Sequence, residues 1–348
     1  MTEKCNFINF VCINIFWSSL MGLTDSYNRK IDYIRVSVTD RCNLRCIYCM
    51  PSEGVREITH TEILRYEEIV RLLSVAADLG IKKVRITGGE PLVRKGLPSL
   101  IKAISNIKGI EEISLTTNGV LLRNFARELK EAGLKRLNIS LDSMNPNRYE
   151  EITRGNNLAD VWEGIKIAEG LGFSPIKINM VPIRGFNDNE IKDFASLTFN
   201  KPYHIRFIEF MPTGAKEIWS KDKCISVQEI KDVISELGEL KPIKNEWGSG
   251  PAKNFRIDGA RGVVGFISAI SDHFCGGCNR LRLTSDGKLR PCLFSSLEID
   301  LKKAIRDGGS DEDLRRIFVS AIEIKPEKHY LNELPPELLI KSMSKIGG

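Results

Sequence analysis

Two short clusters of cysteines, far apart in the sequence, constrain this chain more than any other feature. The first cluster consists of Cys42, Cys46 and Cys49, and the second of Cys275, Cys278 and Cys292. The chain has nine cysteines in total, an odd number that does not suit a disulfide framework. Tight clusters in a reducing compartment usually bind metal. We therefore expect a cytoplasmic protein whose fold holds two sets of three thiolates.

The first cluster, in "CNLRCIYC", has the spacing C-x3-C-x2-C. Three thiolates from one loop can hold three corners of a cubane iron–sulfur cluster, which normally has four cysteine ligands. One iron is then open to another molecule, as a catalytic zinc keeps one open position. The alternative is a structural zinc site with a fourth ligand elsewhere, because thiolates also suit zinc.

The second cluster has the spacing C-x2-C-x13-C and again lacks an obvious fourth cysteine, although His273 is a candidate ligand. A structural zinc knuckle is the alternative to an iron site with an open position. Arg280 and Arg282 alternate on an expected strand, so their side chains point to the same face. Two guanidinium groups on one face suit an anionic ligand, whereas two surface arginines would be the ordinary reading without the adjacent cluster.

The composition is that of an ordinary globular enzyme, with 348 residues, 42% hydrophobic and 28% charged residues and a net charge of +6. No run of Lys and Arg is dense enough to predict nucleic-acid binding. Residues 1–20 are apolar, but they are interrupted by Asn9 and Asn14 and lack a strongly basic start, so the case for a signal peptide or membrane anchor is weak. We interpret them as a non-essential extension or a mis-assigned start, with Met21 as the real start, and expect poor order.

Short β-rich runs alternate with amphipathic helical stretches between residues 34 and 210. The predicted strands are 34–39, 83–87, 113–117, 136–141, 177–181 and 205–210, and the predicted helices are 61–79, 121–132, 158–171 and 188–198. This alternation predicts a parallel sheet with right-handed crossovers. A flat doubly wound sheet and an incomplete parallel (β/α)6 barrel both fit, and the barrel predicts that the chemistry lies at the C-terminal ends of the strands.

The distinctive motifs lie at those ends. The first cysteine loop follows the strand at 34–39, and "GGEP" (88–91) follows the strand at 83–87. Gly88 and Gly89 let the backbone approach a ligand closely, and Glu90 offers a carboxylate to an ammonium group. A polar, glycine-containing stretch at 245–256 then marks a boundary. We therefore divide the chain into the extension 1–20, a partial barrel 21–244 and a C-terminal region 245–348 that carries the second cluster.

The first cysteine spacing, with an aromatic residue before the last cysteine, resembles the signature of radical S-adenosylmethionine enzymes, and "GGEP" resembles their methionine-binding element. The series "VTDRCNLRCIYCMP", "VRITGGEPL", "LTTNG", "LNISLDS", "IEFMP" and "CGGCNRLRLTSDGKLRPCL" resembles the GTP 3′,8-cyclase family of molybdenum cofactor biosynthesis. The resemblance covers about residues 22–348, and the terminal "GG" is similar to the family's double-glycine tail.

This resemblance implies a lyase with two 4Fe-4S clusters and S-adenosylmethionine as cofactors. The first cluster would cleave S-adenosylmethionine, and the resulting 5′-deoxyadenosyl radical would take the ribose 3′ hydrogen of GTP. The carbon radical would attack guanine C8 to give (8S)-3′,8-cyclo-7,8-dihydroguanosine 5′-triphosphate, while the second cluster holds the guanine. Implied partners are an electron donor and a cyclic pyranopterin monophosphate synthase that acts on the product. A homodimer is compatible, and no nucleic acid or membrane partner is expected.

The resemblance also implies roles for individual residues. Contacts with S-adenosylmethionine would come from Tyr48, Gly89, Ser140 and Met211. Contacts with GTP would come from Arg35, Arg85, Thr116, Lys177, Arg280, Leu281 and Arg282. Catalysis would involve Arg280, Arg282, Gly347 and Gly348. The charges are consistent with these roles, because a triphosphate needs several cations from separate elements. For each cation taken singly, a structural ion pair is the alternative.

Two other functions remain open from the sequence. One is a radical S-adenosylmethionine peptide maturase with an auxiliary cluster, although such enzymes generally carry more C-terminal cysteines. The other is a non-enzymatic iron–sulfur or zinc module, which leaves "GGEP" and the convergence of motifs at the strand ends unexplained.

Overall fold

The computed structural model of this chain describes residues 23–213, 218–244, 250–329, 331 and 343. The predictions for residues 1–20, for Gly347 and for Gly348 therefore lie outside the described residues.

One twelve-stranded sheet organises the described residues, in the order β12-β11-β10-β1-β2-β3-β4-β5-β6-β9-β8-β7. Its strands are β1 (Tyr33–Ser37), β2 (Lys83–Thr87), β3 (Glu112–Thr117), β4 (Arg136–Ser140), β5 (Lys177–Met180), β6 (His204–Ile208), β7 (Leu240–Pro242), β8 (Lys253–Ile257), β9 (Val263–Ile267), β10 (Arg280–Leu283), β11 (Lys288–Arg290) and β12 (Ile299–Asp300). All neighbours from β10 through β1–β6 to β9 are parallel, and the outer strands on both sides are antiparallel.

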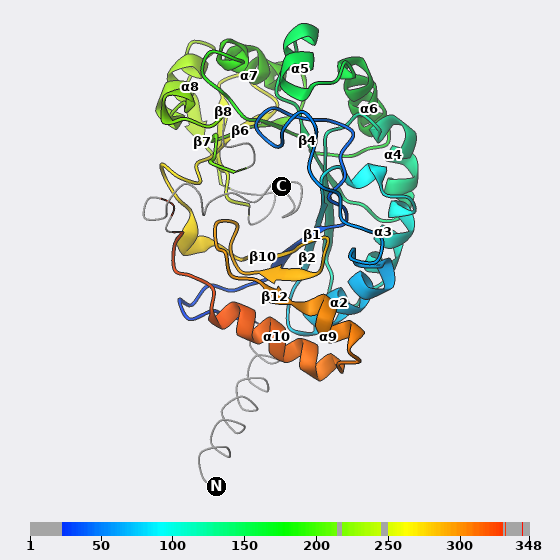
Figure 1. Cartoon of the computed structure of the whole chain (residues 1–348). Helices are drawn as coiled ribbons and strands as arrows, with labels where there is room; N and C mark the ends of the chain where they lie inside the picture. The colour runs from blue at the N-terminus through cyan, green and yellow to red at the C-terminus, as the bar shows by residue number, and fades with distance from the viewer. Residues whose placement is uncertain (1–22, 214–217, 245–249, 330, 332–342, 344–348) are drawn as a thin grey trace.

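Helices follow the parallel strands and lie on the outer, convex side of the curved sheet (Figure 1). They are α2 (Tyr66–Asp78), α3 (Leu97–Ser105), α4 (Leu122–Glu131), α5 (Pro146–Thr153), α6 (Leu158–Gly170), α7 (Ile191–Asn200), α8 (Val227–Ser235), α9 (Leu301–Arg306) and α10 (Asp311–Glu323). Single 3-10 turns are η1 (Pro91–Val93), η2 (Asp188–Glu190), η3 (Lys221–Lys223) and η4 (Cys275–Gly277). None of the helices in the described ranges is both long enough and apolar enough to cross a membrane.

The six predicted strands are observed, with ends shifted by at most two residues. The predicted helix at 61–79 begins later, at Tyr66, because the Glu68 carboxylate accepts a hydrogen bond from the Arg65 backbone N–H (2.6 Å). This cap satisfies a backbone donor that the helix itself cannot use and so fixes where the helix starts. The residues before it form turns instead.

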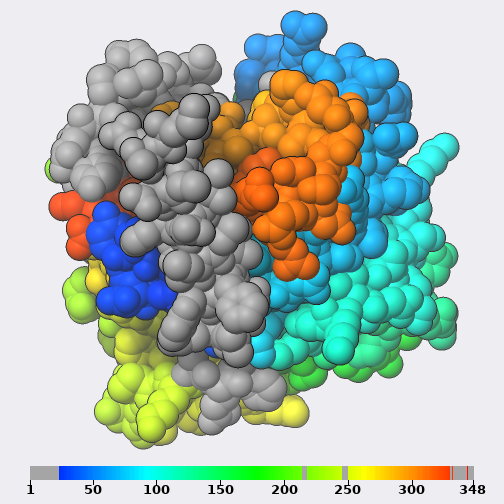
Figure 2. Space-filling model, turned by 90° about the horizontal axis from the view of Figure 1, so that it is seen from below, coloured from blue at the N-terminus to red at the C-terminus, as the bar shows by residue number. Residues whose placement is uncertain are grey.

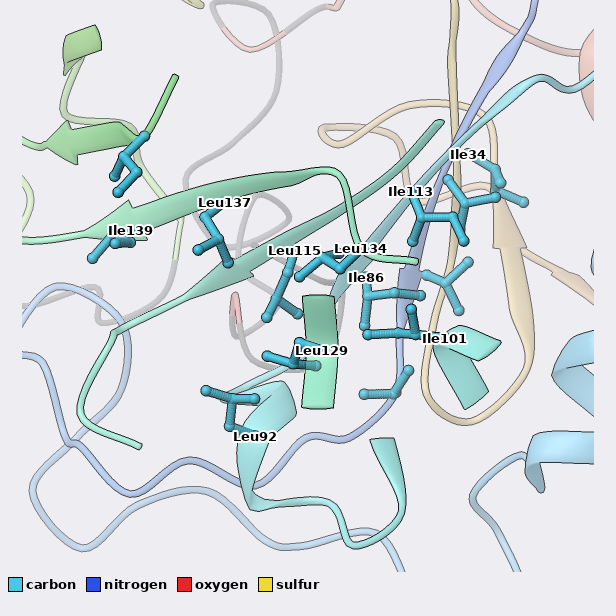
Figure 3. Packing of buried hydrophobic residues seen from close by; sticks show 14 of the residues in the cluster. Ile34, Ile86, Leu92, Ile101, Ile113, Leu115, Leu129, Leu134, Leu137 and Ile139 are labelled. Carbon is cyan, nitrogen blue, oxygen red and sulfur yellow. The ribbon is translucent and has the colours of Figure 1, made fainter. Parts of the chain in front are cut away.

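The main hydrophobic core lies between the sheet and the outer helices (Figure 3). The outward residues of each strand pack against the apolar faces of the helices, as Ile86 and Leu115 do beside Ile101 and Leu129. Because strand side chains alternate, the neighbouring positions on the same strands must point to the concave side. Polar residues occupy those positions, including Arg85 on β2 and Thr116 on β3.

The C-terminal region completes both edges of the sheet. Strand β9 pairs with β6, and β10 pairs with β1, so the residues of the second cysteine cluster reach the same sheet as the first. Helices α9 and α10 pack beside α2 (Figure 2). Arg306 binds the Glu68 carboxylate at 2.8 Å, and Arg71 and Asp311 form an ion pair, also at 2.8 Å. These contacts fix the chain that follows the second cluster to the first βα unit.

Candidate active site

The first cysteine loop follows β1 and lies at the C-terminal end of the parallel strands. Backbone hydrogen bonds from Arg45 N–H to Thr153 O (3.0 Å) and from Ile47 N–H to Ile152 O (2.9 Å) attach this loop to the end of α5. The side chains of Cys42, Cys46 and Cys49 all line one cavity on the concave side of the sheet. The loop therefore presents three thiols from a short segment that is anchored between them.

The surroundings of these thiols disfavour free thiolates. Burial raises the pKa of Cys42 to about 11, and the nearby Glu90 carboxylate adds to the rise. Burial also raises the pKa of Cys46 well above its usual value, with further contributions from Cys49 and Asp142. The donors that reach the Cys42 sulfur are neutral, namely Leu44 N–H (3.4 Å) and Asn118 Nδ2 (3.8 Å). Ionised thiols at this site thus need a bound cation for compensation.

The "GGEP" turn is held against the loop that precedes the first cysteine. The Gly89 N–H donates to Thr39 O at 2.7 Å, and a Cβ on Gly89 would lie 2.3 Å from Arg41 O. Only glycine fits such a close approach. The Glu90 carboxylate accepts hydrogen bonds from Leu92 N–H (3.0 Å), Thr117 Oγ1 (2.8 Å) and Asn118 N–H (2.7 Å).

This network corrects one sequence-based expectation. We expected the Glu90 carboxylate to meet an ammonium group of a ligand, but its side chain is buried and is bound to the turn after β3. Burial raises the pKa of Glu90 to about 7, although its hydrogen bonds oppose the rise. Glu90 therefore links the "GGEP" and "TNG" turns, and the backbone of Gly88 and Gly89 is what faces the cavity.

Three other residues assigned to S-adenosylmethionine also line this cavity: Tyr48, Ser140 and Met211. The Tyr48 hydroxyl donates to Asp142 Oδ2 at 2.5 Å, and Asp142 Oδ1 accepts from Val181 N–H at 2.8 Å. Burial raises the pKa of Asp142 to about 6 against the effect of these hydrogen bonds. Asp142, which the sequence reasoning did not single out, fixes the orientation of Tyr48 between two of the cysteines.

The second cysteine loop leaves β9 and enters β10, and Cys292 follows β11. Cys275, Cys278 and Cys292 line the same cavity as the first three cysteines. Because β10 pairs in parallel with β1, the two cysteine sites approach the cavity from neighbouring strands. The structure thus brings together two clusters that are more than two hundred residues apart in the sequence.

Cations surround Cys278. Its sulfur accepts from Arg280 Nη2 and from Lys325 Nζ, both at 3.6 Å. Burial alone would raise the pKa of Cys278, but the charges of Arg280 and Lys325 outweigh burial and lower that pKa to about 6. Arg280 also stacks over the Phe274 ring at 4.6 Å from the ring centroid. His273 forms an edge contact with His329.

A row of three arginines crosses three adjacent strands. Arg282 on β10 is in register with Arg35 on β1, and Arg35 is in register with Arg85 on β2. Neighbouring strands lie only about 4.8 Å apart. Burial, followed by the charges of Arg282 and Arg85, lowers the pKa of Arg35 well below its usual value, and burial lowers the pKa of Arg282 to about 10. Closely spaced cations on a buried surface need an anion to offset their repulsion.

Lys177 on β5 extends this positive surface. It is 3% exposed, and burial together with the charges of Arg206 and Arg85 lowers its pKa to about 6. The buried Arg35 Nε and Thr116 Oγ1 have no hydrogen-bond partner among the described residues. Both residues line the cavity. Orphaned donors beside clustered cations fit a bound polyanion that accepts several hydrogen bonds.

Sequence reasoning missed three further cations of this cavity: Lys83, Arg136 and Arg206. Arg206 lies inside the apolar strand β6, as Lys177 lies inside the apolar strand β5. Lys83 precedes Arg85 by two positions and so shares its face of β2. Burial and Arg85 lower the pKa of Arg206 to about 9. Lys83 and Arg136 also form ion pairs, with Asp32 (3.7 Å) and Glu112 (3.2 Å).

Leu281 is the one described residue of the predicted set that does not face the cavity. Its side chain is fully buried in the hydrophobic core, because it lies between Arg280 and Arg282 on β10 and points to the opposite face. Any contact of Leu281 with a ligand would therefore involve only its backbone. Gly347 and Gly348 lie outside the described residues.

The six cavity cysteines suit iron–sulfur groups, whose usual ligands are cysteine thiolates. All are free thiols. Within the described ranges, no three Cys, His, Asp or Glu side chains converge on a point that one metal ion could occupy. Three cysteine ligands at each site would leave one iron of a 4Fe-4S cluster open to another molecule.

The cavity can therefore combine two functions. At one end, three thiols lie beside a glycine turn whose backbone is open to a ligand. At the other end, three thiols lie beside a row of cations that suits a triphosphate or a similar polyanion. A cavity that combines two sets of thiols with a row of cations supports redox chemistry on an anionic substrate.

Comparison with known families agrees with this division. The sequence matches the family described as "Radical SAM superfamily" over residues 36–198 and the family "Molybdenum Cofactor Synthesis C" over residues 203–331. The first match runs from the end of β1 through β5 and contains the first cysteine site, and the second contains strands β6–β12 and the second cysteine site.

Close relatives cover almost the whole chain. A protein of Pelotomaculum thermopropionicum named "GTP 3′,8-cyclase" is 52% identical over 94% of this chain and 100% of its own length. A protein of Alkaliphilus metalliredigens with the same name is also 52% identical, with the same coverage of both chains. Among solved structures, Streptococcus suis SuiB matches 91% of this chain and 77% of its own chain with a TM-score of 0.60. At 16% identity, this match shows a shared fold only.

Proposed function

This chain belongs to the GTP 3′,8-cyclase family within the radical S-adenosylmethionine superfamily, and on that premise we propose how its own residues divide the reaction. It is an enzyme of molybdenum cofactor biosynthesis that uses S-adenosylmethionine and iron–sulfur clusters to cyclise GTP. The peptide-maturase alternative is not favoured, because the relatives that cover 94% of this chain carry the cyclase name.

The first cysteine site would hold a 4Fe-4S cluster and S-adenosylmethionine. Cys42, Cys46 and Cys49 would ligate three irons. When bound, this pair of cofactors supplies the one-electron chemistry that starts the reaction at the ribose of GTP. The protein's part is to position the cofactor: the Gly88–Gly89 backbone offers hydrogen-bonding groups without side chains, and Asp142 orients Tyr48. Ser140 and Met211 would complete this end of the cavity.

The second cysteine site and the sheet cations would hold GTP. Cys275, Cys278 and Cys292 would ligate a second cluster that binds the base at its open iron. Arg280 and Arg282, beside these cysteines, would contact the substrate near the reacting atoms, and Gly347 and Gly348 would approach the same place. Arg35, Arg85, Thr116 and Lys177 would bind the phosphates, with Leu281 contributing only backbone. The row of arginines in register across β10, β1 and β2 supports this assignment.

The architecture that we propose is an incomplete parallel (β/α)6 barrel formed by β1–β6 and their helices. Residues 21–244 would form this barrel and residues 245–348 the auxiliary-cluster region, with residues 1–20 as an extension. The curved arrangement of the strands supports the barrel (Figure 1). The parallel pairing of β9 and β10 with the outer barrel strands explains how the C-terminal region reaches the cavity.

Partners follow from the chemistry. The clusters require an electron donor, and the cyclised nucleotide requires a synthase that converts it to cyclic pyranopterin monophosphate. We place the protein in the cytoplasm, where reduced thiols persist. We also propose that it can form a homodimer.

The observation that carries this proposal is that six cysteines and a row of three arginines share one cavity. The test is an anaerobic assay of the reconstituted protein with dithionite, S-adenosylmethionine and GTP. We expect 5′-deoxyadenosine and the 3′,8-cyclised triphosphate to form in a GTP-dependent manner. ATP in place of GTP serves as the matched control, because it keeps the triphosphate but changes the base.

Two outcomes would contradict the proposal. If 5′-deoxyadenosine forms equally with GTP, with ATP and without nucleotide, the cavity does not recognise GTP. If none forms while both clusters are present by iron analysis, the chain is an iron–sulfur module without this activity.

A further inference from the structure

A buried lysine outside the predicted site contacts the second cysteine cluster. Lys325 directly follows the last turn of α10 and is 3% exposed. Its ammonium donates to Pro291 O (2.6 Å), to Arg280 O (2.9 Å) and to Cys278 Sγ (3.6 Å). A lysine ammonium has three N–H donors and no acceptor, so these three contacts use its full capacity.

These contacts join the two segments that carry Cys278 and Cys292. Arg280 lies two residues after Cys278, and Pro291 directly precedes Cys292. One ammonium therefore holds the start of β10 and the end of β11 at a fixed separation, and it touches one of the sulfurs as well.

A buried arginine supports the third cysteine from the other side. Arg29 Nη1 donates to Cys275 O (2.9 Å) and to Glu327 O (2.8 Å), and Nη2 donates to Pro326 O (2.7 Å). Its Nε forms an ion pair with Asp25 at 2.6 Å. Arg29 thus ties the segment directly after Lys325 to the backbone of Cys275. The two cations together contact residues at or beside all three cysteines.

We propose that Lys325 is a positioning residue of the second cysteine site, which sets the spacing of Cys278 and Cys292 and holds a fixed positive charge at the cluster. Lysines usually extend their ammonium into water, and burial of a charge is costly unless it is paired. A tie between two carbonyls alone could be made by a neutral amide. The positive charge is therefore needed for the third contact, in which the ammonium donates to the sulfur of Cys278.

The expected consequence is electrochemical. The reduction potential of an iron–sulfur cluster depends on the charges nearby and on the hydrogen bonds to its sulfurs. Reduction adds an electron, so a fixed positive charge favours the reduced form. Removal of that charge is expected to shift the potential of the second cluster to more negative values. This inference rests on the proposed function, because it requires a cluster at the second site.

The test isolates the second cluster in the full chain by Ala substitution of Cys42, Cys46 and Cys49. After anaerobic reconstitution, iron per chain and the reduction potential are measured, the latter by EPR-monitored titration. The variants are Lys325→Gln, which keeps two N–H donors without the charge, and Lys325→Arg, which keeps the charge. Lys303→Gln is the matched control, since Lys303 is an exposed lysine paired with Asp307 far from the cavity.

We expect Lys325→Gln to bind less iron and to show a more negative potential, Lys325→Arg to restore the potential, and Lys303→Gln to match the parent. A potential in Lys325→Gln equal to that of the parent overturns the proposal. If Lys325→Gln binds no iron, Lys325→Arg decides: restored iron at the parent potential supports the proposal, and failure to restore it overturns the proposal.

Arg29→Gln separates the two cations. Arg29 contacts carbonyl oxygens and Asp25, but no sulfur, in the described structure, so its loss is expected to lower iron content with a smaller shift in potential than Lys325→Gln. An equal or larger shift contradicts the special role of Lys325. If the parent itself forms no cluster, the proposed function fails at the second site. That result differs from one in which the cluster forms but its reduction potential does not depend on Lys325, which overturns only the present inference.

Discussion

The two ends of the cavity each present three cysteines, but the charges nearest to Cys42 and to Cys278 differ. At the first end, the hydrogen-bond donors that reach Cys42 from the described residues are neutral, and burial, with a further contribution from Glu90, raises its pKa to about 11. At the second end, the charges of Arg280 and Lys325 overcome burial and lower the pKa of Cys278 to about 6. The main charged neighbour of Cys42 is thus an anion, Glu90, opposed by Arg45, whereas the main charged neighbours of Cys278 are two cations.

This difference in charge is consistent with the two functions proposed for the two ends of the cavity. Nearby negative charge disfavours added electrons, so it makes a cluster a stronger reductant, which the cleavage of a sulfonium requires. Nearby positive charge favours anionic ligands and suits a cluster that holds a nucleotide. The difference supports the proposal that radical generation takes place at the first end and substrate binding at the second, and the following substitutions test that proposal.

The largest effect on activity is expected when a cysteine of the first site is replaced. Cys46→Ala removes one of three ligands, and formation of 5′-deoxyadenosine should fall to background. In Cys278→Ala the first site is intact but the GTP site is impaired, so slow cleavage of S-adenosylmethionine that does not require GTP should persist, while GTP-dependent cleavage and the cyclised product disappear. Both products are measured by liquid chromatography with iron analysis of each variant. If Cys278→Ala also loses the GTP-independent cleavage although the first cluster is assembled, the two ends do not have separate functions.

The next effect concerns the arginine row at the second end. Arg282→Ala should weaken GTP turnover by roughly 10- to 150-fold, because a hydrogen bond to a charged group contributes about 1.5–3 kcal/mol. Both clusters should still assemble, as iron analysis would show. Arg316→Ala on α10 is the control, since that side chain is exposed and far from the cavity. Loss of the second cluster in Arg282→Ala would give Arg282 a structural role instead.

A smaller effect is expected on the affinity for GTP, which should depend on pH through the ionisation of Lys177. Burial, with help from Arg206 and Arg85, lowers the pKa of Lys177 to about 6, so this side chain is mostly neutral at pH 7.5 without substrate. A bound triphosphate favours the ammonium and raises that pKa. Binding should therefore take up a proton, and affinity should fall by up to about ten-fold per pH unit above pH 6 until the raised pKa is passed.

Calorimetry in two buffers of different ionisation enthalpy measures this proton uptake. Lys177→Met is the control, because it keeps the titration of the phosphates themselves and removes only that of the lysine. Equal proton uptake in the parent and in Lys177→Met would show that Lys177 does not contact the phosphates.

The sequence predicted much of this arrangement because the informative signals are local. The six parallel strands follow from short apolar runs between helices, and the two cysteine clusters are visible as spacings. Lys177 was assigned through the family resemblance, and its place inside an apolar strand is consistent with a functional role, because a buried charge needs a partner. Arg206 gives the same signal on β6 and was missed, although it could have been found by the same rule.

Other features depend on contacts that no local pattern shows. Glu90 was expected to face a ligand, but the structure binds its carboxylate to Thr117 and Asn118 on the next turn. Lys325 lies 47 residues from Cys278 in the sequence and has no motif of its own. The pairing of β10 with β1, which brings the two cysteine sites together, is set by packing across the whole chain.

The smallest expected effect compares the glycine pairs at the two ends. A Cβ on Gly89 would lie 2.3 Å from Arg41 O, whereas a Cβ on Gly276, between two cysteines of the second site, would meet nothing within 4 Å. Gly89→Ala should therefore cost about 1–3 kcal/mol through overpacking and lower the Tm by roughly 2–4 °C per kcal/mol. It should also weaken S-adenosylmethionine binding. Gly276→Ala should change stability by less than about 0.5 kcal/mol. Thermal unfolding of the metal-free protein measures both, and equal destabilisation would mean that the backbone at the first end is no more closely packed than at the second.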